Sequence, residues 1–100
     1  MKRYGEMSRD ELREELDRLE AAKRNAEFPS QREMLEQKIW MAKAYLRSDE
    51  TFPQGVYKVA GRSEPFELKY VNGVMAWGRI GTEDEASFPI SMLERREHSL

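Results

Sequence analysis

The sequence has no cysteine, only one histidine, and an almost balanced charge. The lack of cysteine excludes disulfide bonds, thiolate metal sites and cysteine nucleophiles, and it fits a reducing cytoplasm. Lys and Arg number 17 against 19 Asp and Glu, so the net charge of −2 disfavours bulk binding to a polyanion. No apolar run approaches the ~20 residues that span a bilayer, and no apolar segment follows the first basic residues. We therefore expect a cytoplasmic protein with no standard secretion signal and no membrane partner.

The residue types that catalysis requires are scarce or poorly placed. The one histidine, His98, lies third from the end of the sequence in a polar segment, where nothing fixes it beside a base or a nucleophile. The acidic residues 83–85 lack the Asp, Asn and Gly spacing of a calcium-binding loop. There is no Gly-rich phosphate loop, nucleophile elbow or paired-histidine motif. We expect no enzyme activity, no catalytic residue, no cofactor and no metal.

The first half of the sequence predicts two helices joined by a short turn. Residues 8–11 read Ser-Arg-Asp-Glu, which fits a capping box, and apolar residues then recur at steps of three or four for about eighteen residues. Pro29 interrupts this pattern. A second capping box over residues 30–33 predicts a new helix from about residue 31 to about residue 47. The short connection predicts an antiparallel helical hairpin, preceded by a loosely held lead-in over residues 1–7.

The stretch 66–78 predicts a β-hairpin, because two β-type runs flank the pair Asn72-Gly73. Asn-Gly is typical of a two-residue type I′ turn, in which both central residues take positive φ. A turn at these two residues would align Phe66 with Arg79. It would also place five mostly aromatic side chains on one face of the hairpin: Phe66, Leu68, Tyr70, Met75 and Trp77. We expect this face to be buried, and Lys69 to lie on the opposite face.

Further short strands are predicted around the hairpin. Residues 56–60 and 86–90 have β-type patterns, and Pro89 is expected at an edge or at the end of a strand. Residues 81–85 are expected to form an acidic loop, residues 91–94 one helical turn, and residues 95–100 a solvated tail. These elements predict a small curled antiparallel barrel and an α+β fold. We expect the helical hairpin in residues 1–50 and the barrel in residues 51–100 to form one compact unit.

Four segments of the sequence, in this order, resemble the YfhH-like family of small bacterial proteins. They are 41–46 (Met-Ala-Lys-Ala-Tyr-Leu), 52–57 (Phe-Pro-Gln-Gly-Val-Tyr), 70–78 (Tyr-Val-Asn-Gly-Val-Met-Ala-Trp-Gly) and 88–93 (Phe-Pro-Ile-Ser-Met-Leu). The resemblance covers nearly the whole chain. It implies an N-terminal helical hairpin packed on a C-terminal SH3-like antiparallel β-barrel. Transcriptional regulation has been suggested for the family, but the resemblance implies no catalytic or ligand-binding residue.

Three residues are candidates for contacts with a partner. Trp40 lies off the apolar stripe of the second helix, so it belongs either to an exposed partner surface or to internal packing. Lys69 and Arg79 are the candidate nucleic-acid contacts if the curled sheet brings them together, although a solvated exterior explains them as well. The aromatic residues of the strands either fill the barrel or form a stacking platform for bases or a proline-rich peptide. Because the barrel is small, we expect them mainly inside.

These observations predict a non-catalytic module that binds a protein partner or associates with itself. The alternative is a nucleic-acid-associated transcriptional regulator, which the near-neutral charge does not support.

Overall fold

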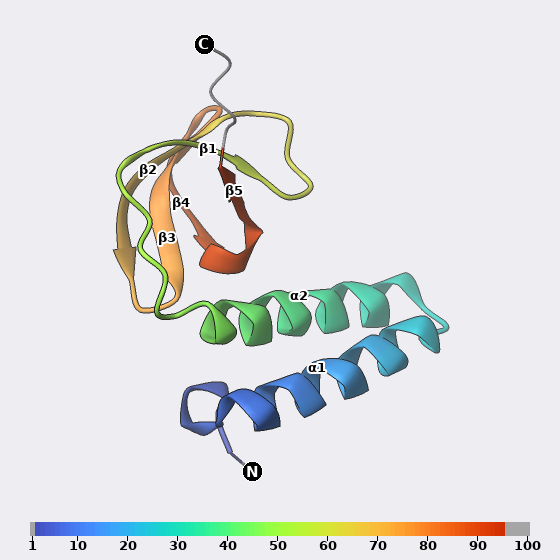
Figure 1. Ribbon diagram of the computed structural model, residues 1–100. Helices are drawn as coiled ribbons and strands as arrows, with labels where there is room; N and C mark the ends of the chain where they lie inside the picture. Colours follow the sequence, from blue (N-terminus) through green and yellow to red (C-terminus); the bar gives the residue numbers. More distant parts are fainter. Residues whose placement is uncertain (1, 96–100) are drawn as a thin grey trace. The chain divides into compact units, whose positions relative to one another are not determined.

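The computed structural model describes residues 2–95 and has an α+β fold (Figure 1). The chain divides into two compact units, Met1–Ser48 and Asp49–Leu100. The first unit contains a 3₁₀ turn, η1 (Tyr4–Glu6), and two helices, α1 (Arg9–Arg24) and α2 (Pro29–Leu46). The second unit contains a five-stranded sheet. Each unit is described below by itself.

Helix α1 begins with the predicted capping box. The Ser8 hydroxyl accepts a 3.2 Å hydrogen bond from the Glu11 amide, and the Glu11 carboxylate accepts a 3.0 Å hydrogen bond from the Ser8 amide. Lys2 adds an ion pair of 3.0 Å to the same carboxylate. These contacts satisfy backbone donors that the first turn of a helix leaves without partners. The first capping box is therefore confirmed.

Helix α2 does not begin at the second predicted capping box. It starts one residue earlier, at Pro29, with Phe28 as an N-cap that makes no side-chain hydrogen bond to the helix. Proline fits the first helical position because its missing N–H is one that the helix would not use, and its φ is already helical. The prediction that residues 30–33 cap this helix was wrong, because Pro29 belongs to the helix that it was expected to precede.

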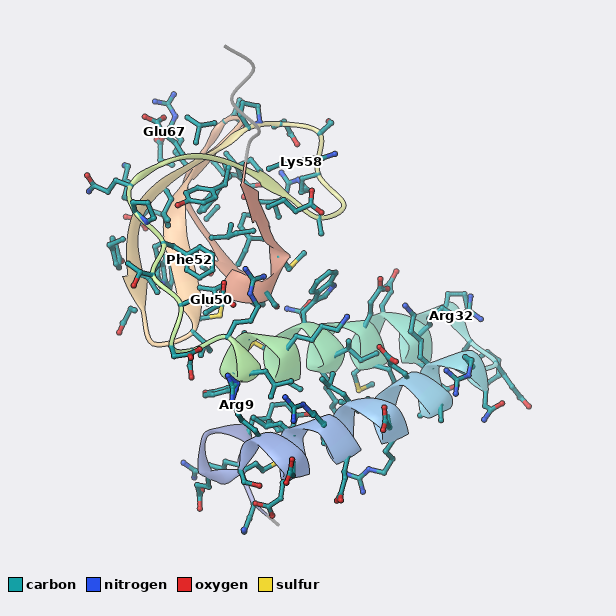
Figure 2. The ribbon with its side chains drawn as sticks, in the orientation of Figure 1. Arg9, Arg32, Glu50, Phe52, Lys58 and Glu67 are labelled. Carbon is teal, nitrogen blue, oxygen red and sulfur yellow. The ribbon has the colours of Figure 1, made fainter. Side chains whose placement is uncertain are left out.

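The two helices lie side by side and share one apolar core (Figure 1). Its buried members are Leu12, Leu19, Ile39 and Ala42. Tyr4 of the lead-in also packs against this core, and its ring meets the Tyr45 ring edge-on with centroids 6.4 Å apart. Arg9 reaches from the start of α1 to the end of α2, where it donates a 3.2 Å hydrogen bond to the Leu46 carbonyl (Figure 2).

The second unit is a curled antiparallel half-barrel sheet with strand order β4-β3-β2-β1-β5 (Figure 1). Consecutive strands pair from β1 to β4, and β5 returns to pair with β1 after a 3₁₀ turn, η2 (Ile90–Met92). The strands are β1 (Gly55–Val59), β2 (Phe66–Asn72), β3 (Met75–Ile80), β4 (Glu83–Pro89) and β5 (Leu93–Arg95).

Two strand predictions need correction. Residues 83–85 form the first part of β4 instead of an acidic loop, since the turn before them is confined to residues 81–82. The predicted helical turn at 91–94 is a 3₁₀ turn that ends at Met92, and β5 follows it. Pro89 closes β4, which is an edge strand, as predicted. The predicted tail beyond residue 95 lies outside the described residues.

The hairpin turn lies one residue later than predicted. Asn72 pairs with Met75, so Gly73 and Val74 are the central residues. Gly73 has φ +64°, and no non-glycine residue among those described has positive φ. Positive φ at the first central residue alone is the pattern of a type II′ turn, whereas a type I′ turn at Gly73 and Val74 would require it at Val74 as well. The predicted type I′ turn and its register were therefore wrong.

The predicted aromatic face is split between the two sides of the sheet. Phe66 and Leu68 are buried inside, where the Phe66 ring meets the Phe88 ring edge-on with centroids 5.3 Å apart. On β3 the buried residues are Ala76, Gly78 and Ile80. Tyr70 and Trp77 belong to the opposite, outer side, so the prediction that they share the buried face with Phe66 was wrong.

Candidate functional site

The outer side of the sheet carries an exposed pair of stacked aromatic rings. Tyr70 of β2 and Trp77 of β3 are register partners, with ring centroids 6.3 Å apart and planes that differ by 9°. Offset stacking at such a distance is a favourable arrangement of two rings. Tyr70 nevertheless remains 56% exposed, while Trp77 is half-buried. The pair therefore offers an aromatic surface that a ligand could cover.

A β-bulge in β2 places Tyr70 on this outer side. Leu68 and Tyr70 pair with two adjacent residues of β3, so Lys69 is an extra residue with no register partner there. An extra residue shifts the alternation of the side chains that follow it. Leu68 is consequently buried inside, while Lys69 and Tyr70 are both exposed. The Gln54 side-chain amide donates a 2.8 Å hydrogen bond to the Lys69 carbonyl and so supports the bulge.

Gly78 allows the two strands to approach closely beside the bulge. A Cβ atom on Gly78 would lie 2.9 Å from the carbonyl carbon of Glu67, 3.1 Å from Leu68 Cα, and closer still to the Glu67 carbonyl oxygen. All three are backbone atoms, which cannot swing aside as a flexible side chain can. Glycine at this position therefore permits the close approach of β2 and β3 beside the bulge that carries Tyr70.

Charges of both signs surround the aromatic pair. Arg79 Nε lies 3.4 Å from Asp84 Oδ1, and both side chains are exposed. Glu67 is the register partner of Arg79 and projects from the sheet (Figure 2). Glu85, also exposed, lies with Asp84 opposite Arg79, so together with Lys69 there are two positive and three negative side chains here. The electrostatic character of the surface is therefore mixed.

The structure brings both predicted nucleic-acid contacts to the side of the aromatic pair. Lys69 was expected opposite the aromatic face, and that was wrong because the bulge turns Tyr70 to the same side as Lys69. Arg79 was expected to pair with Phe66 and instead pairs with the next residue, Glu67. Glycine inside a strand often marks a bulge or a close approach, so Gly78 was the feature that pointed to this arrangement. A role of Lys69 and Arg79 in nucleic-acid binding stays a prediction.

Trp40, the predicted partner contact, lies in the other unit. It is half-buried on α2, and the Lys43 ammonium lies 5.3 Å from the centroid of its ring. It lines an open groove of about 390 Å³ together with residues of both helices. Its function as a partner surface stays a prediction.

Comparison with protein families matches residues 2–94 to the family described as "Protein of unknown function (DUF1811)". The chain belongs to the DUF1811 family. It is similar to "Uncharacterized protein YfhH" of Bacillus subtilis (strain 168), with 38% identity over 102 residues that cover 96% of this chain and 98% of the relative. The resemblance to the YfhH-like family is thus confirmed over nearly the whole chain.

Local contacts shift the pKa values of Glu11, Glu64 and Tyr4 in the described part of this DUF1811 chain. The hydrogen bond from the Ser8 amide, followed by that from Lys2, lowers the pKa of the Glu11 carboxyl. A hydrogen bond from Arg62 lowers the pKa of Glu64 in the same way. Burial raises the pKa of the Tyr4 hydroxyl, and the nearby Glu15 carboxylate adds to the rise. None of these groups lies at the aromatic pair.

Within residues 2–95, no three His, Asp or Glu side chains lie close enough together to hold a metal ion. The one histidine of this DUF1811 chain, His98, lies outside the described residues. In the same described part, no helix has the length and apolar character needed to cross a bilayer.

Proposed function

We propose that this protein is a non-catalytic binding module whose partner is another protein. The half-barrel is proposed to be an SH3-like barrel, which the return of β5 to β1 after a 3₁₀ turn supports. The packing of the helical hairpin on this barrel stays a prediction from the family resemblance. The partner surface is the outer side of the sheet around Tyr70 and Trp77, called the aromatic surface below.

The exposed stack is the observation that carries this proposal. Tyrosine and tryptophan are the residue types most enriched where protein interfaces derive their affinity, because a rigid ring buries a large area at a small cost in entropy. Here one ring is 56% exposed although it stacks on another. A partner that covers the Tyr70 ring would remove further apolar surface from water, and each Å² of apolar surface removed stabilises the complex by about 25 cal/mol.

The charges around the aromatic surface favour a protein over a polyanion. Protein interfaces surround an aromatic centre with a polar rim, in which arginine is common. The rim here contains Lys69 and Arg79 together with Glu67, Asp84 and Glu85, so its negative charges outnumber its positive ones. Nucleic-acid binding depends on several cations that neutralise phosphates, and the three carboxylates oppose that effect.

The experiment is affinity capture with the immobilised full chain and two matched variants. Tyr70→Ala removes the exposed ring, and Phe28→Ala removes a ring of nearly equal exposure, 59% against 56%, from the other unit. We expect at least one protein that the wild type and Phe28→Ala retain and Tyr70→Ala loses roughly tenfold or more, a typical cost of removing an interface aromatic. Equal capture by all three chains would refute the proposal. Circular dichroism shows that both variants are folded before they are compared.

Nucleic acid is the second candidate, and the parallel geometry of the stack is what favours it. Bases stack on exposed aromatic rings, and each such contact contributes about 1–3 kcal/mol. A short single-stranded oligonucleotide should then quench the emission of Trp77, with an affinity that falls steeply as salt rises. If the oligonucleotide quenches the emission and Tyr70→Ala abolishes the quenching, nucleic acid and not a protein is the ligand of the aromatic surface. An unchanged emission at low salt excludes nucleic acid as the ligand.

A further inference from the structure

The groove between α1 and α2 has the form of a site for a third helix. It is lined by the last turns of α1, at Glu20, Lys23 and Arg24, and by one face of α2 from Arg32 to Lys43. The eleven residue-to-residue steps from Arg32 to Lys43 correspond to about 16 Å of helix, or three turns. An open channel of this length between two neighbouring helices suits a helix better than a compact small molecule. Its volume of about 390 Å³ is continuous with solvent.

The floor of the groove is apolar. Ile39 is 6% exposed and belongs to the shared core of the two helices. Trp40, the next residue, is half-buried, and its indole ring forms part of the wall. An apolar floor of this kind can receive the apolar side chains that recur every three or four residues along one face of a docked helix.

The rim of the groove is positive although the whole chain is negative. Four cations, Lys23, Arg24, Arg32 and Lys43, line it against two carboxylates, Glu20 and Glu36. This is a local excess of two positive charges in a chain whose net charge is −2.

The cations are only partly occupied by the chain's own carboxylates. Lys23 Nζ lies 3.7 Å from Glu36 Oε1, so these two charges offset each other. Arg32 donates a 3.4 Å hydrogen bond to the Ala26 carbonyl. A guanidinium has five N–H donors, so most of those on Arg32 remain available for a carboxylate. Lys43 lies over the Trp40 ring and adds a fixed positive charge beside the apolar floor.

We infer that the groove between α1 and α2 binds an acidic amphipathic helix of a partner protein. Its apolar side chains lie on Ile39 and Trp40, and its carboxylates pair with Arg24, Arg32 and Lys43. Charge complementarity selects an acidic helix over a basic one. The apolar floor distinguishes such a helix from a simple polyanion, which would contact the cations alone. This site lies in the first unit and does not depend on the aromatic surface of the second.

The experiment uses the full chain and a synthetic amphipathic peptide of about 18 residues, long enough to span the groove. The probe carries leucine on one face and glutamate on the others, and a matched probe has lysine in place of every glutamate. In a Trp77→Phe background, Trp40 is the single tryptophan and reports binding through its emission. We expect saturable binding of the acidic peptide, and binding of the basic peptide at least roughly tenfold weaker.

Two charge reversals on the same helix locate the site. Lys43→Glu reverses a charge at the groove, and Lys38→Glu reverses the same residue type at an exposed position that does not line it. We expect Lys43→Glu to weaken acidic-peptide binding roughly tenfold or more, and Lys38→Glu to change it less than about twofold. Tyr70→Ala should have no effect, which separates this site from the aromatic surface.

Several results would overturn the inference. These are no response to the acidic peptide at about 1 mM, equal binding of both peptides, or equal effects of the two reversals. An equal response to a single-stranded oligonucleotide would show that the groove is a general polyanion site. A change of Trp40 emission on dilution without peptide would show that a second copy of the chain occupies the groove.

Discussion

Replacing Gly78 by alanine perturbs the position on which the aromatic surface depends. The added Cβ would lie 2.9 Å and 3.1 Å from backbone carbons of the neighbouring strand. Carbon atoms pack at about 3.5–4.0 Å, and the still closer carbonyl oxygen increases the overlap. The strands β2 and β3 must therefore separate by about 1 Å beside the bulge.

The expected cost follows from this separation. Overpacking a well-packed site typically costs about 1–3 kcal/mol. One or two ladder hydrogen bonds that stretch add about 0.5–1.5 kcal/mol each. Alanine has less conformational freedom than glycine in the unfolded chain, which offsets this loss of stability by only about 0.4–1 kcal/mol. We expect a net loss of about 3 kcal/mol, a large part of the roughly 5–15 kcal/mol that stabilises a small domain.

Urea unfolding in a Trp40→Phe background, followed by the emission of Trp77, measures this loss. Gly61→Ala is the matched control, because Gly61 has φ +79° but nothing within 4 Å of an added Cβ. Its cost is limited to the left-handed backbone, about 1–2 kcal/mol. If Gly78→Ala proved as stable as Gly61→Ala, the close approach of β2 and β3, and the support it gives Tyr70, would be refuted.

Three further predictions concern the first unit. Leu12→Ala should lower the free energy of unfolding by about 2–5 kcal/mol, because Leu12 is 3% exposed in the helical core. Met34→Ala is the control and should change it by less than about 0.5 kcal/mol, because Met34 is 59% exposed. Urea unfolding followed by circular dichroism measures both. Ser8→Ala should cost about 1 kcal/mol through loss of the cap. The lowered pKa of Glu11 means that its contribution is fully present above the ordinary pKa of a glutamate carboxyl and is lost as the pH falls through the lower pKa of the folded state. The urea midpoint should therefore fall on acidification, and this fall should be smaller in Glu11→Gln; identical pH profiles would contradict the assignment.

The helices could be predicted from the sequence because their causes are local. The capping box at Ser8 and the apolar spacing from Leu12 onward depend on residues within a few positions of each other. The start of the second helix was misplaced by the same local reasoning, since Pro29 can either precede a helix or occupy its first position. The local pattern fits both roles, and the structure shows the second.

The aromatic surface could not be predicted because it depends on pairing between strands. Strict alternation from Phe66 places Tyr70 inside, and one extra residue at Lys69 reverses that result. The bulge requires the close approach at Gly78 and the hydrogen bond from Gln54, which lies outside both strands. Gly78 marks a possible bulge in the sequence, but it does not show which strand carries the extra residue, and the contact from Gln54 has no sequence pattern of its own.

The groove of the first unit illustrates a similar limit. Trp40 was identified as unusual because it departs from the apolar stripe. The cations around Trp40 come from two helices. Their excess over carboxylates cannot be read from the sequence, because each half of the chain is nearly neutral in charge. Charge on a surface depends on which faces the fold brings together.

Site-directed photocrosslinking in living cells tests the central claim, that the aromatic surface binds a protein, most directly. A photoreactive phenylalanine analogue replaces Asn72, which is exposed two residues from Tyr70 on the same strand, and in a second chain replaces the exposed Phe28 of the other unit. We predict an adduct with a partner protein from position 72 that disappears when Tyr70→Ala is added and is not formed from position 28. No adduct from position 72, or one that persists in Tyr70→Ala, would contradict the account.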